Sequence, residues 1–145
     1  MIKLVSNTDI LPLRNLVLRE GRLTLDECRF PSDELPGSFH LGFFRNEELA
    51  CIASFHIQAY GSYAGKGYQL RGMATLPRYQ GQGLGSELVS YAFDYLQQQG
   101  ANYVWCNARK KAAVFYERLG FGIISDEFEV PGIGPHYVMY RKIQA

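Results

Sequence analysis

The sequence has few cysteines, no long apolar run and no excess of one charge. Its three cysteines, Cys28, Cys51 and Cys106, are odd in number and lack Cys-x-x-Cys spacing, which argues against a disulfide framework and against a zinc site. No run of 18 apolar residues occurs, so no transmembrane helix is expected. The first residues also lack the uninterrupted apolar core of a signal peptide. These absences predict a reduced, cytoplasmic protein that binds neither a metal nor a membrane.

The balance of charges further restricts the classes of partner that the protein is expected to bind. The chain carries 15 Lys and Arg against 14 Asp and Glu, a formal charge of +1, which provides no field to attract nucleic acid or an anionic membrane. A hydrophobic content of 47% over 145 residues is enough for one domain with a sizeable core. No linker, repeat or low-complexity segment interrupts it. We therefore expect a single domain over residues 1–145.

Local patterns predict helices that alternate with strands. Asp9 is expected to cap a first amphipathic helix with Arg14 on its polar edge, and a second short helix is expected over 24–30. Two later helices, 84–99 and 111–119, are each stopped by a glycine. Strands are expected over 39–44, 49–60, 68–76, 103–107, 121–130 and 136–142. Helices interleaved with a largely antiparallel sheet predict an α/β fold.

A glycine-rich hexamer, Gln80-Gly81-Gln82-Gly83-Leu84-Gly85, joins an expected strand to an expected helix. Glycine carries no Cβ and reaches positive φ without penalty, so an oxyanion can come close to the main chain. The first N–H groups of the following helix lack intrahelical partners and lie at the positive end of its dipole. The hexamer therefore predicts a cradle for a pyrophosphate; alternatively, its glycines serve only the turn.

Two common phosphate ligands do not fit this hexamer. A P-loop ends in Gly-Lys-Ser/Thr, whereas here Ser86 follows Gly85 with no lysine before it. The dinucleotide fingerprint requires Gly-x-Gly-x-x-Gly and an acid about 20 residues further on, and the corresponding segment 100–106 contains neither Asp nor Glu. ATP and NAD are therefore disfavoured.

Two ordered segments resemble a known family. Gln80-x-x-Gly83-x-Gly85 resembles the Arg/Gln-x-x-Gly-x-Gly/Ala signature of the GNAT N-acyltransferases, which hold the pyrophosphate of acetyl-CoA. Asn107, followed by Phe-Tyr-x-x-Leu-Gly-Phe over 115–121, is similar to that family's block after the next strand. The resemblance covers about residues 39–143. It implies a GNAT-like α/β fold, in which a mixed, largely antiparallel sheet is flanked by helices on both faces, and acetyl-CoA as the acyl donor.

The cradle and the resemblance together predict the residues that bind the donor. These are Met73, Ala74, Thr75, Gln80, Gly81, Gln82, Gly83, Leu84, Gly85, Ser86, Asn107 and Tyr116. In the family, the strand before the cradle pairs by its main chain with the pantetheine arm. This implies that a backbone N–H of segment 72–75 polarises the thioester carbonyl. Asn107 could hydrogen-bond the amide groups of the donor, or it could belong to a helix N-cap region.

Tyr116 is the candidate general acid. Positions 112, 115, 116 and 119 follow the i, i+3, i+4, i+7 pattern, so Tyr116 is expected on the inward face of its helix. It also matches the tyrosine of the family's block. A phenol with a pKa of about 10 is protonated at neutral pH and can donate to a leaving thiolate. Alternatively, Tyr116 is a core tyrosine with a satisfied hydroxyl group.

The general base is ambiguous from sequence. Glu127 and Glu129 alternate with apolar residues and are expected on one face of a strand, where they could simply be solvated. His136 follows the turn 131–135 and has a suitable pKa range, but it could be structural. Weaker candidates are Asp33 and Glu34, as acids that bind a cationic amine, His40 and His56, and Cys28 as a covalent relay.

The predicted function is that of an N-acyltransferase. It moves an acetyl group from acetyl-CoA to a primary amine of a small-molecule or peptide acceptor, by direct attack of the amine. Tyr60, Tyr63, Tyr68 and Tyr137 could line the acceptor pocket. The alternative is a non-catalytic module that senses CoA or acyl-CoA, because only an enzyme needs Tyr116 and a base. The sequence leaves the acceptor unidentified and a homodimer open.

Overall fold

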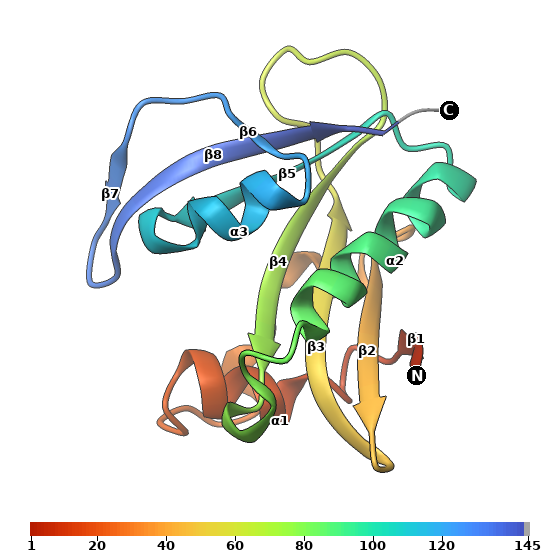
Figure 1. Cartoon of the computed structure of the whole chain (residues 1–145), viewed down its shortest axis with the longest axis vertical. Coiled ribbons are helices and arrows are strands. Elements are labelled where there is room, and N and C mark those ends of the chain that lie inside the picture. The colour runs from red at the N-terminus through yellow and green to blue at the C-terminus, as the bar shows by residue number, and fades with distance from the viewer. Residues whose placement is uncertain (144–145) are drawn as a thin grey trace. The chain divides into compact units, whose positions relative to one another are not determined.

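The computed structural model describes residues 1–143 and groups them into two compact units (Figure 1). Unit 1 contains Met1–Ile57 and Leu70–Ala92, and unit 2 contains Gln58–Gln69 and the chain from Phe93 onward. Strand β4 (Gly67–Thr75) and helix α2 (Leu84–Gln98) each contribute residues to both units. The prediction of a single domain over 1–145 stays a prediction.

Unit 1 contains four neighbouring strands, in the order β1-β2-β3-β4. Strands β1 (Ile2–Val5), β2 (Phe39–Arg45) and β3 (Glu48–Ile57) pair antiparallel in sequence. The β2–β3 turn consists of two residues, Asn46 and Glu47, with φ of 54° and 63°. Positive φ at both positions is the type I′ geometry, whose twist matches that of the strands. Strand β1 was missed from sequence, and the hairpin was predicted.

The first helical segment of unit 1 is shorter than predicted. It consists of α1 (Leu11–Leu13) and a π turn, η1 (Arg14–Leu18). The predicted cap is wrong, because the Asp9 carboxylate accepts the N–H of Ser6 at 3.1 Å and the N-cap is Ile10. The expected helix over 24–30 is also replaced by a single 3₁₀ turn of three residues. The 3₁₀ turns of this unit are η2 (Asp26–Cys28), η3 (Pro31–Glu34) and η4 (Pro77–Tyr79).

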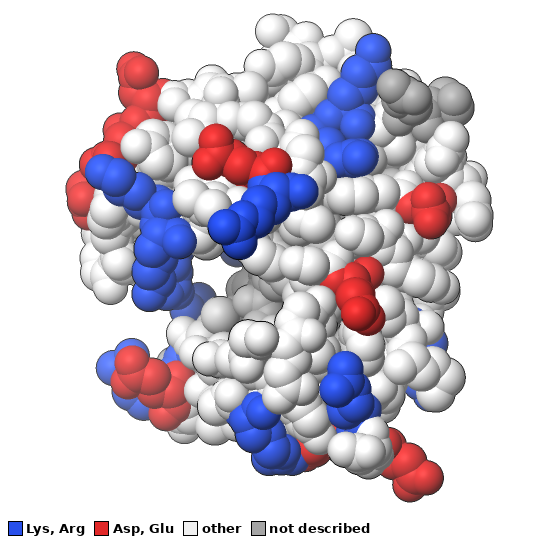
Figure 2. Space-filling view, viewed as in Figure 1, with Lys and Arg blue, Asp and Glu red and all other residues white. Residues whose placement is uncertain are grey.

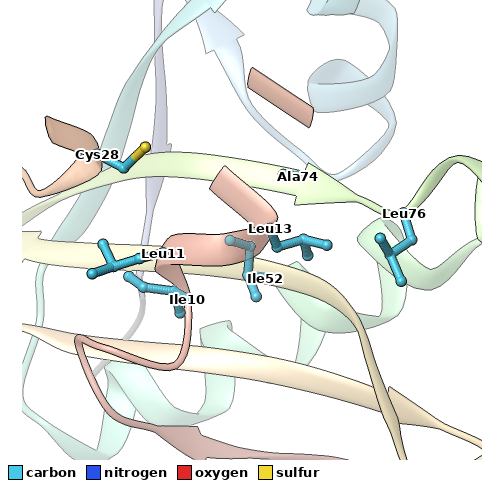
Figure 3. Packing of buried hydrophobic residues seen from close by; sticks show 7 residues of the cluster. All are labelled: Ile10, Leu11, Leu13, Cys28, Ile52, Ala74 and Leu76. Carbon is cyan, nitrogen blue, oxygen red and sulfur yellow. The ribbon is translucent and has the colours of Figure 1, made fainter. Parts of the chain in front are cut away.

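The core of unit 1 joins this N-terminal segment to the strands behind it (Figure 3). Apolar side chains from α1 meet side chains from β3 and from the end of β4, so burial of apolar surface fixes the segment against the sheet. The cluster comprises Ile10, Leu11, Leu13, Cys28, Ile52, Ala74 and Leu76.

In unit 2 the strand order is β4-β5-β8-β6, with β7 also paired to β8. Strand β4 runs parallel to β5, and β8 is antiparallel to β5, β6 and β7. Their bounds are β5 (Tyr103–Arg109), β6 (Gly122–Ile123), β7 (Phe128–Val130) and β8 (Gly134–Lys142). The predicted strand over 121–130 is therefore wrong, because residues 124–127 separate two short strands.

The two predicted glycine stops are confirmed. Helix α2 ends at Gln98 and is followed by Gly100, whose φ is 78°, and the N–H of Ala101 returns to Leu96 O at 3.0 Å. Helix α3 (Ala113–Arg118) follows the 3₁₀ turn η5 (Lys110–Ala112), and Gly120 follows it with a φ of 93°. Helix α3 contacts β5 and β8 of its own unit (Figure 1).

The strands and helices confirm the predicted fold class, a mixed, largely antiparallel sheet flanked by helices. Figure 2 shows acidic and basic side chains interspersed over one face of the molecule, as the balanced composition leads one to expect. Among residues 1–143, no helix is both long enough and apolar enough to cross a membrane.

Candidate functional site

The loop between η4 and α2 has the open geometry that the hexamer predicts. Gly81 and Gly83 have φ of 78° and 81°, in the left-handed region that favours glycine. A Cβ built on either residue would meet no heavy atom within 4 Å, so the space above both is open. A bulky anion can therefore reach the main chain here, and the loop fits a pyrophosphate group.

Polar contacts hold this loop on both sides. Gln80 Nε2 donates to Thr75 O at 3.1 Å, which ties the loop to the end of β4. Gln82 Nε2 donates to Arg78 O at 3.1 Å, and Arg78 forms an ion pair with Glu48 that lowers the pKa of this carboxyl group. These hydrogen bonds hold the loop in position without a contact from a ligand.

Helix α2 is anchored directly after the loop. Leu84 is 2% exposed, so its side chain belongs to the core and only its main chain could face a ligand. Gly85 and Ser86 are half-buried, and the N–H of Glu87 donates to Gly83 O at 3.1 Å to close the first turn. The N–H groups ahead of that bond have no intrahelical acceptor and lie at the positive end of a 15-residue helix.

Strand β4 also contains a glycine at a position where the backbone conformation favours glycine. Gly72 has a φ of 63° inside the strand, and a Cβ there would lie 2.9 Å from Arg14 Nε. Positive φ within a strand is typical of a bulge, which re-aims the backbone that follows it. Met73 and Thr75 are half-buried, and Ala74 packs in the core.

Tyr116 lies on α3 and is 9% exposed, which confirms its predicted inward position. Its ring meets those of Phe115 and Phe121 edge-on, with centroids 5.0 and 5.3 Å away. Asn107 is exposed on β5, and Arg109 occupies the N-cap position of the next helical turn. The roles of Tyr116 and Asn107 stay predictions.

The structure places the three candidate bases in different settings. Glu127 precedes β7 rather than sharing a strand with Glu129, and Lys110 Nζ contacts its carboxylate at 2.8 Å. This hydrogen bond lowers the pKa of Glu127. Glu129 is exposed on β7. His136 lies in β8, within its predicted strand 136–142, where it is buried, and its Nδ1 lies 2.8 Å from Gly134 O.

Arg14 does not lie on a polar surface edge, as was predicted. It is 1% exposed, and its two terminal nitrogens contact the two carboxylate oxygens of Asp33 at 2.7 and 2.9 Å. It also donates to Cys28 O at 3.0 Å and to Ser54 Oγ at 2.8 Å. Buried charges persist where they are paired and hydrogen-bonded, and this pair meets both conditions.

The pair extends into a network that sequence reasoning missed. His56 Nε2 lies 2.9 Å from Asp33 Oδ1, and its Nδ1 lies 2.8 Å from Ser32 Oγ. Burial alone would raise the pKa of Asp33, but the hydrogen bonds from Arg14 and His56 outweigh it and hold that pKa well below its usual range. Both carboxylate oxygens of Asp33 therefore have partners within the fold, and its predicted role in binding a cationic amine stays a prediction.

His40 completes the network. Its Nδ1 lies 2.7 Å from Ser54 Oγ, its Nε2 lies 3.2 Å from Asp33 O, and burial lowers its pKa. A signal was present in the sequence, because Ser54 and His56 alternate as polar residues along an otherwise apolar strand. Among residues 1–143, no group of three or more His, Cys, Asp or Glu side chains is placed to hold a metal ion.

The tyrosines proposed for an acceptor pocket lie in unit 2. Tyr60 contacts Trp105 at a centroid distance of 4.8 Å, and Tyr63 stacks on Tyr140 at 4.9 Å. Tyr68 is 1% exposed and therefore has no surface to offer a ligand. The hydroxyl of Tyr137 donates to Glu127 at 3.4 Å.

Comparison with known proteins decides the family. The model of the acetyltransferase (GNAT) family matches residues 10–121. The chain belongs to this family. It is 38% identical over 144 residues to YitI of Bacillus subtilis, an uncharacterized N-acetyltransferase, and this match covers 99% of the chain and 96% of the relative.

Solved structures agree with this assignment at the level of the fold. An aminoglycoside 6'-N-acetyltransferase complexed with coenzyme A superposes with a TM-score of 0.79 at 16% identity, covering 100% of this chain and 98% of the other. ElaA of Escherichia coli superposes with a TM-score of 0.77 at 18% identity, covering 97% and 98%. The predicted GNAT membership and N-acetyltransferase class are thus confirmed.

Proposed function

We propose that this protein transfers an acetyl group from acetyl-CoA to the primary amine of a small-molecule or peptide acceptor, by direct attack of the amine on the thioester. The open glycine cradle at the start of α2, in a chain of the GNAT family, carries this proposal. A cytoplasmic location and a homodimer stay predictions.

Acetyl-CoA supplies the activated acyl group. The N–H groups of Gly81, Gly83 and Gly85 hold its pyrophosphate, helped by the dipole of α2. The main chain from Met73 to Thr75 hydrogen-bonds the donor arm and polarises the carbonyl with an N–H group. Support for this role comes from Gly72, whose positive φ re-aims the backbone at this point.

The remaining steps are proton transfers. Tyr116 donates its phenolic proton to the leaving sulfur, and Asn107 hydrogen-bonds the amide groups of the donor. Glu129, His136 or Glu127 removes a proton from the amine. Lys110 lowers the pKa of Glu127, which weakens this carboxylate as a base.

Two measurements on the same sample test the proposal. Calorimetric titration with CoA reports the cradle, and a thiol-release assay with acetyl-CoA and a panel of primary amines reports turnover. Amine-dependent thiol release is the expected result. Tight CoA binding without turnover on any amine would instead indicate a sensor of acyl-CoA, and the absence of CoA binding would overturn the proposal.

A further inference from the structure

Arg71 is a half-buried cation on β4 that forms no ion pair with any residue in the described range 1–143. Its guanidinium carbon lies 4.0 Å from the ring centroid of Phe30. The same ring is covered by the guanidinium of Arg14, at 3.9 Å. One aromatic ring therefore contacts two guanidinium groups.

The carboxylate of Asp33, which contacts Arg14, already has its hydrogen-bond partners. Both carboxylate oxygens of Asp33 are bound by Arg14, and one of them is also bound by His56. Asp33 therefore neutralises Arg14, and although its field also reaches Arg71, no carboxylate among residues 1–143 forms an ion pair with Arg71. Burial and the proximity of Arg14 both lower the pKa of Arg71, as expected for a cation in a partly desolvated, positive environment.

Space for a small group exists beside Phe30. This ring lines a pocket of about 280 Å³, together with Arg29, Pro31, Asp33 and Glu34. It also lines a second, smaller pocket with Arg14. A ligand that enters here meets the aromatic ring on which Arg71 stacks.

The position of Arg71 in the chain relates this residue to the proposed reaction. Arg71 immediately precedes Gly72 and lies two residues before Met73, where the proposed polarising segment begins. Two residues of a strand span about 7 Å. A group bound by Arg71 would therefore lie about one small molecule's length from the carbonyl that the amine attacks.

We propose that Arg71, positioned on Phe30, binds an oxyanion carried by the amine acceptor, either a carboxylate or a phosphate. This inference rests on the proposed function and names its substrate class, an amine that also carries a negative charge. A guanidinium offers paired N–H donors to either group, and such charge-assisted bonds are strong where water is partly excluded. A neutral amine of the same shape leaves that cation unpaired.

Matched amines distinguish this recognition from simple stacking of Arg71 on Phe30. Amino acids are compared with their primary amides, and O-phosphoethanolamine with ethanolamine, in the thiol-release assay. We expect kcat/KM to be at least about tenfold higher for the charged member of one of the two sets, as for a hydrogen bond to a charged group. The set that responds identifies the anion as carboxylate or phosphate.

Three variants test whether Arg71 causes the preference for charged amines. Arg71→Gln is expected to abolish the preference by raising the acceptor KM, with the KM for acetyl-CoA unchanged. Arg71→Lys keeps the charge without the planar fork and is expected to restore part of the preference. Arg22→Gln, which removes an arginine that is 73% exposed, is the matched control and is expected to keep the preference in full.

A binding measurement keeps the inference testable even if no amine in the panel is acetylated. The side-chain Nε–H signal of Arg71 is followed by NMR in the CoA-saturated protein, while each charged amine or its neutral partner is added. A shift with the charged member only is the expected result. Equal kinetics for both members, or an Arg71 signal that none of them moves, would overturn the inference, whereas CoA binding and turnover separately report the proposed function.

Discussion

The pairing of Arg14 with Asp33 places a full charge pair inside unit 1. Asp33→Asn leaves the Arg14 guanidinium buried without its counter-ion, and such losses cost about 3–5 kcal/mol. We expect the free energy of unfolding to fall by that amount in urea titrations. Glu34→Gln removes the adjacent exposed carboxylate and is expected to change it by less than about 0.5 kcal/mol. Equal effects for the two variants would contradict the structural role of the pair.

Tyr116 tests the proposed proton transfer to the leaving group. Tyr116→Phe keeps the ring that packs on Phe115 and Phe121, so we expect the melting temperature and much of the CoA affinity to be retained. Turnover is expected to fall about 100-fold or more, since a general acid contributes at least that much.

The control for this prediction is Tyr91→Phe, which removes a hydroxyl from a tyrosine that is 45% exposed. It is expected to leave kcat unchanged. If chemistry is rate-limiting and kcat of Tyr116→Phe stays within about a factor of two of the parent, then Tyr116 is a packing residue and water or another group supplies the proton.

Single residues differ in how well the sequence predicted them. Tyr116 was placed correctly because helical periodicity alone determines which side of a helix a residue occupies. Arg14 was placed wrongly because its burial depends on a carboxylate 19 positions away, and no local pattern reports such a contact. Arg71 was missed for a similar reason, since its neighbour Phe30 comes from a distant loop.

At the scale of elements, the cradle is open to a direct test. Gly83→Asp places a side chain and a negative charge where a pyrophosphate is expected, so we expect CoA binding to be lost in calorimetry on folded protein. Gly61→Asp is the matched control, because Gly61 also has a positive φ, 53°, and open space around it. Unchanged CoA affinity in Gly83→Asp would contradict the prediction that this loop binds the pyrophosphate of CoA.

The β7–β8 turn tests where the acceptor binds. If this turn contacts the acceptor, then Glu129→Gln and His136→Ala are expected to raise the KM for the amine or to lower kcat, with the KM for acetyl-CoA nearly unchanged. Separate initial-rate series in each substrate measure this. Equal losses for both substrates would assign these residues to the structure alone, as would no loss for either.

Elements were predictable where one periodic pattern and one stop signal agreed. Helix α2 matches its prediction to one residue because an amphipathic run ends in a glycine cap. The strand over 121–130 failed because an apolar run does not show where backbone pairing is interrupted, here at residues 124–127. Strand β1 was missed because it is an edge strand with exposed side chains, which gives no alternating pattern.

For the whole molecule, the buried network predicts how stability depends on pH. The pKa values of Asp33 and His40 are both lowered in the folded state, so the unfolded chain binds more protons as the pH falls. We expect the free energy of unfolding to decrease below about pH 6.5 through His40 and more steeply below about pH 4 through Asp33. Urea titrations from pH 8 to pH 3 measure this, and a flat profile would contradict it.

The same profile in Asp33→Asn provides the internal control. This variant lacks the carboxylate, so the steep decrease below about pH 4 should be weaker than in the parent protein. A decrease of unchanged steepness would assign the acid response to other carboxylates.

The sequence predicted the class of the whole fold better than it predicted the structure of the N-terminal quarter of the chain. The later strands and helices follow strong local signals and a family resemblance, and both pointed to the same mixed sheet. After strand β1, the first 38 residues form short helical turns whose positions depend on packing of Ile10 and Leu11 and on the Arg14 pair. Such segments are determined by tertiary contacts, which local propensity does not encode.

Thiol labelling of the three buried cysteines can measure local opening of the chain. All three are free and at most 4% exposed, and burial raises the pKa of Cys51 and brings that of Cys106 to about 12. Because thiol reagents attack the thiolate, the native chain adds little background to a thiol-release assay. Cys28 and Cys51 lie in unit 1 and Cys106 in unit 2, so the labelling rate at each site measures how often that unit opens.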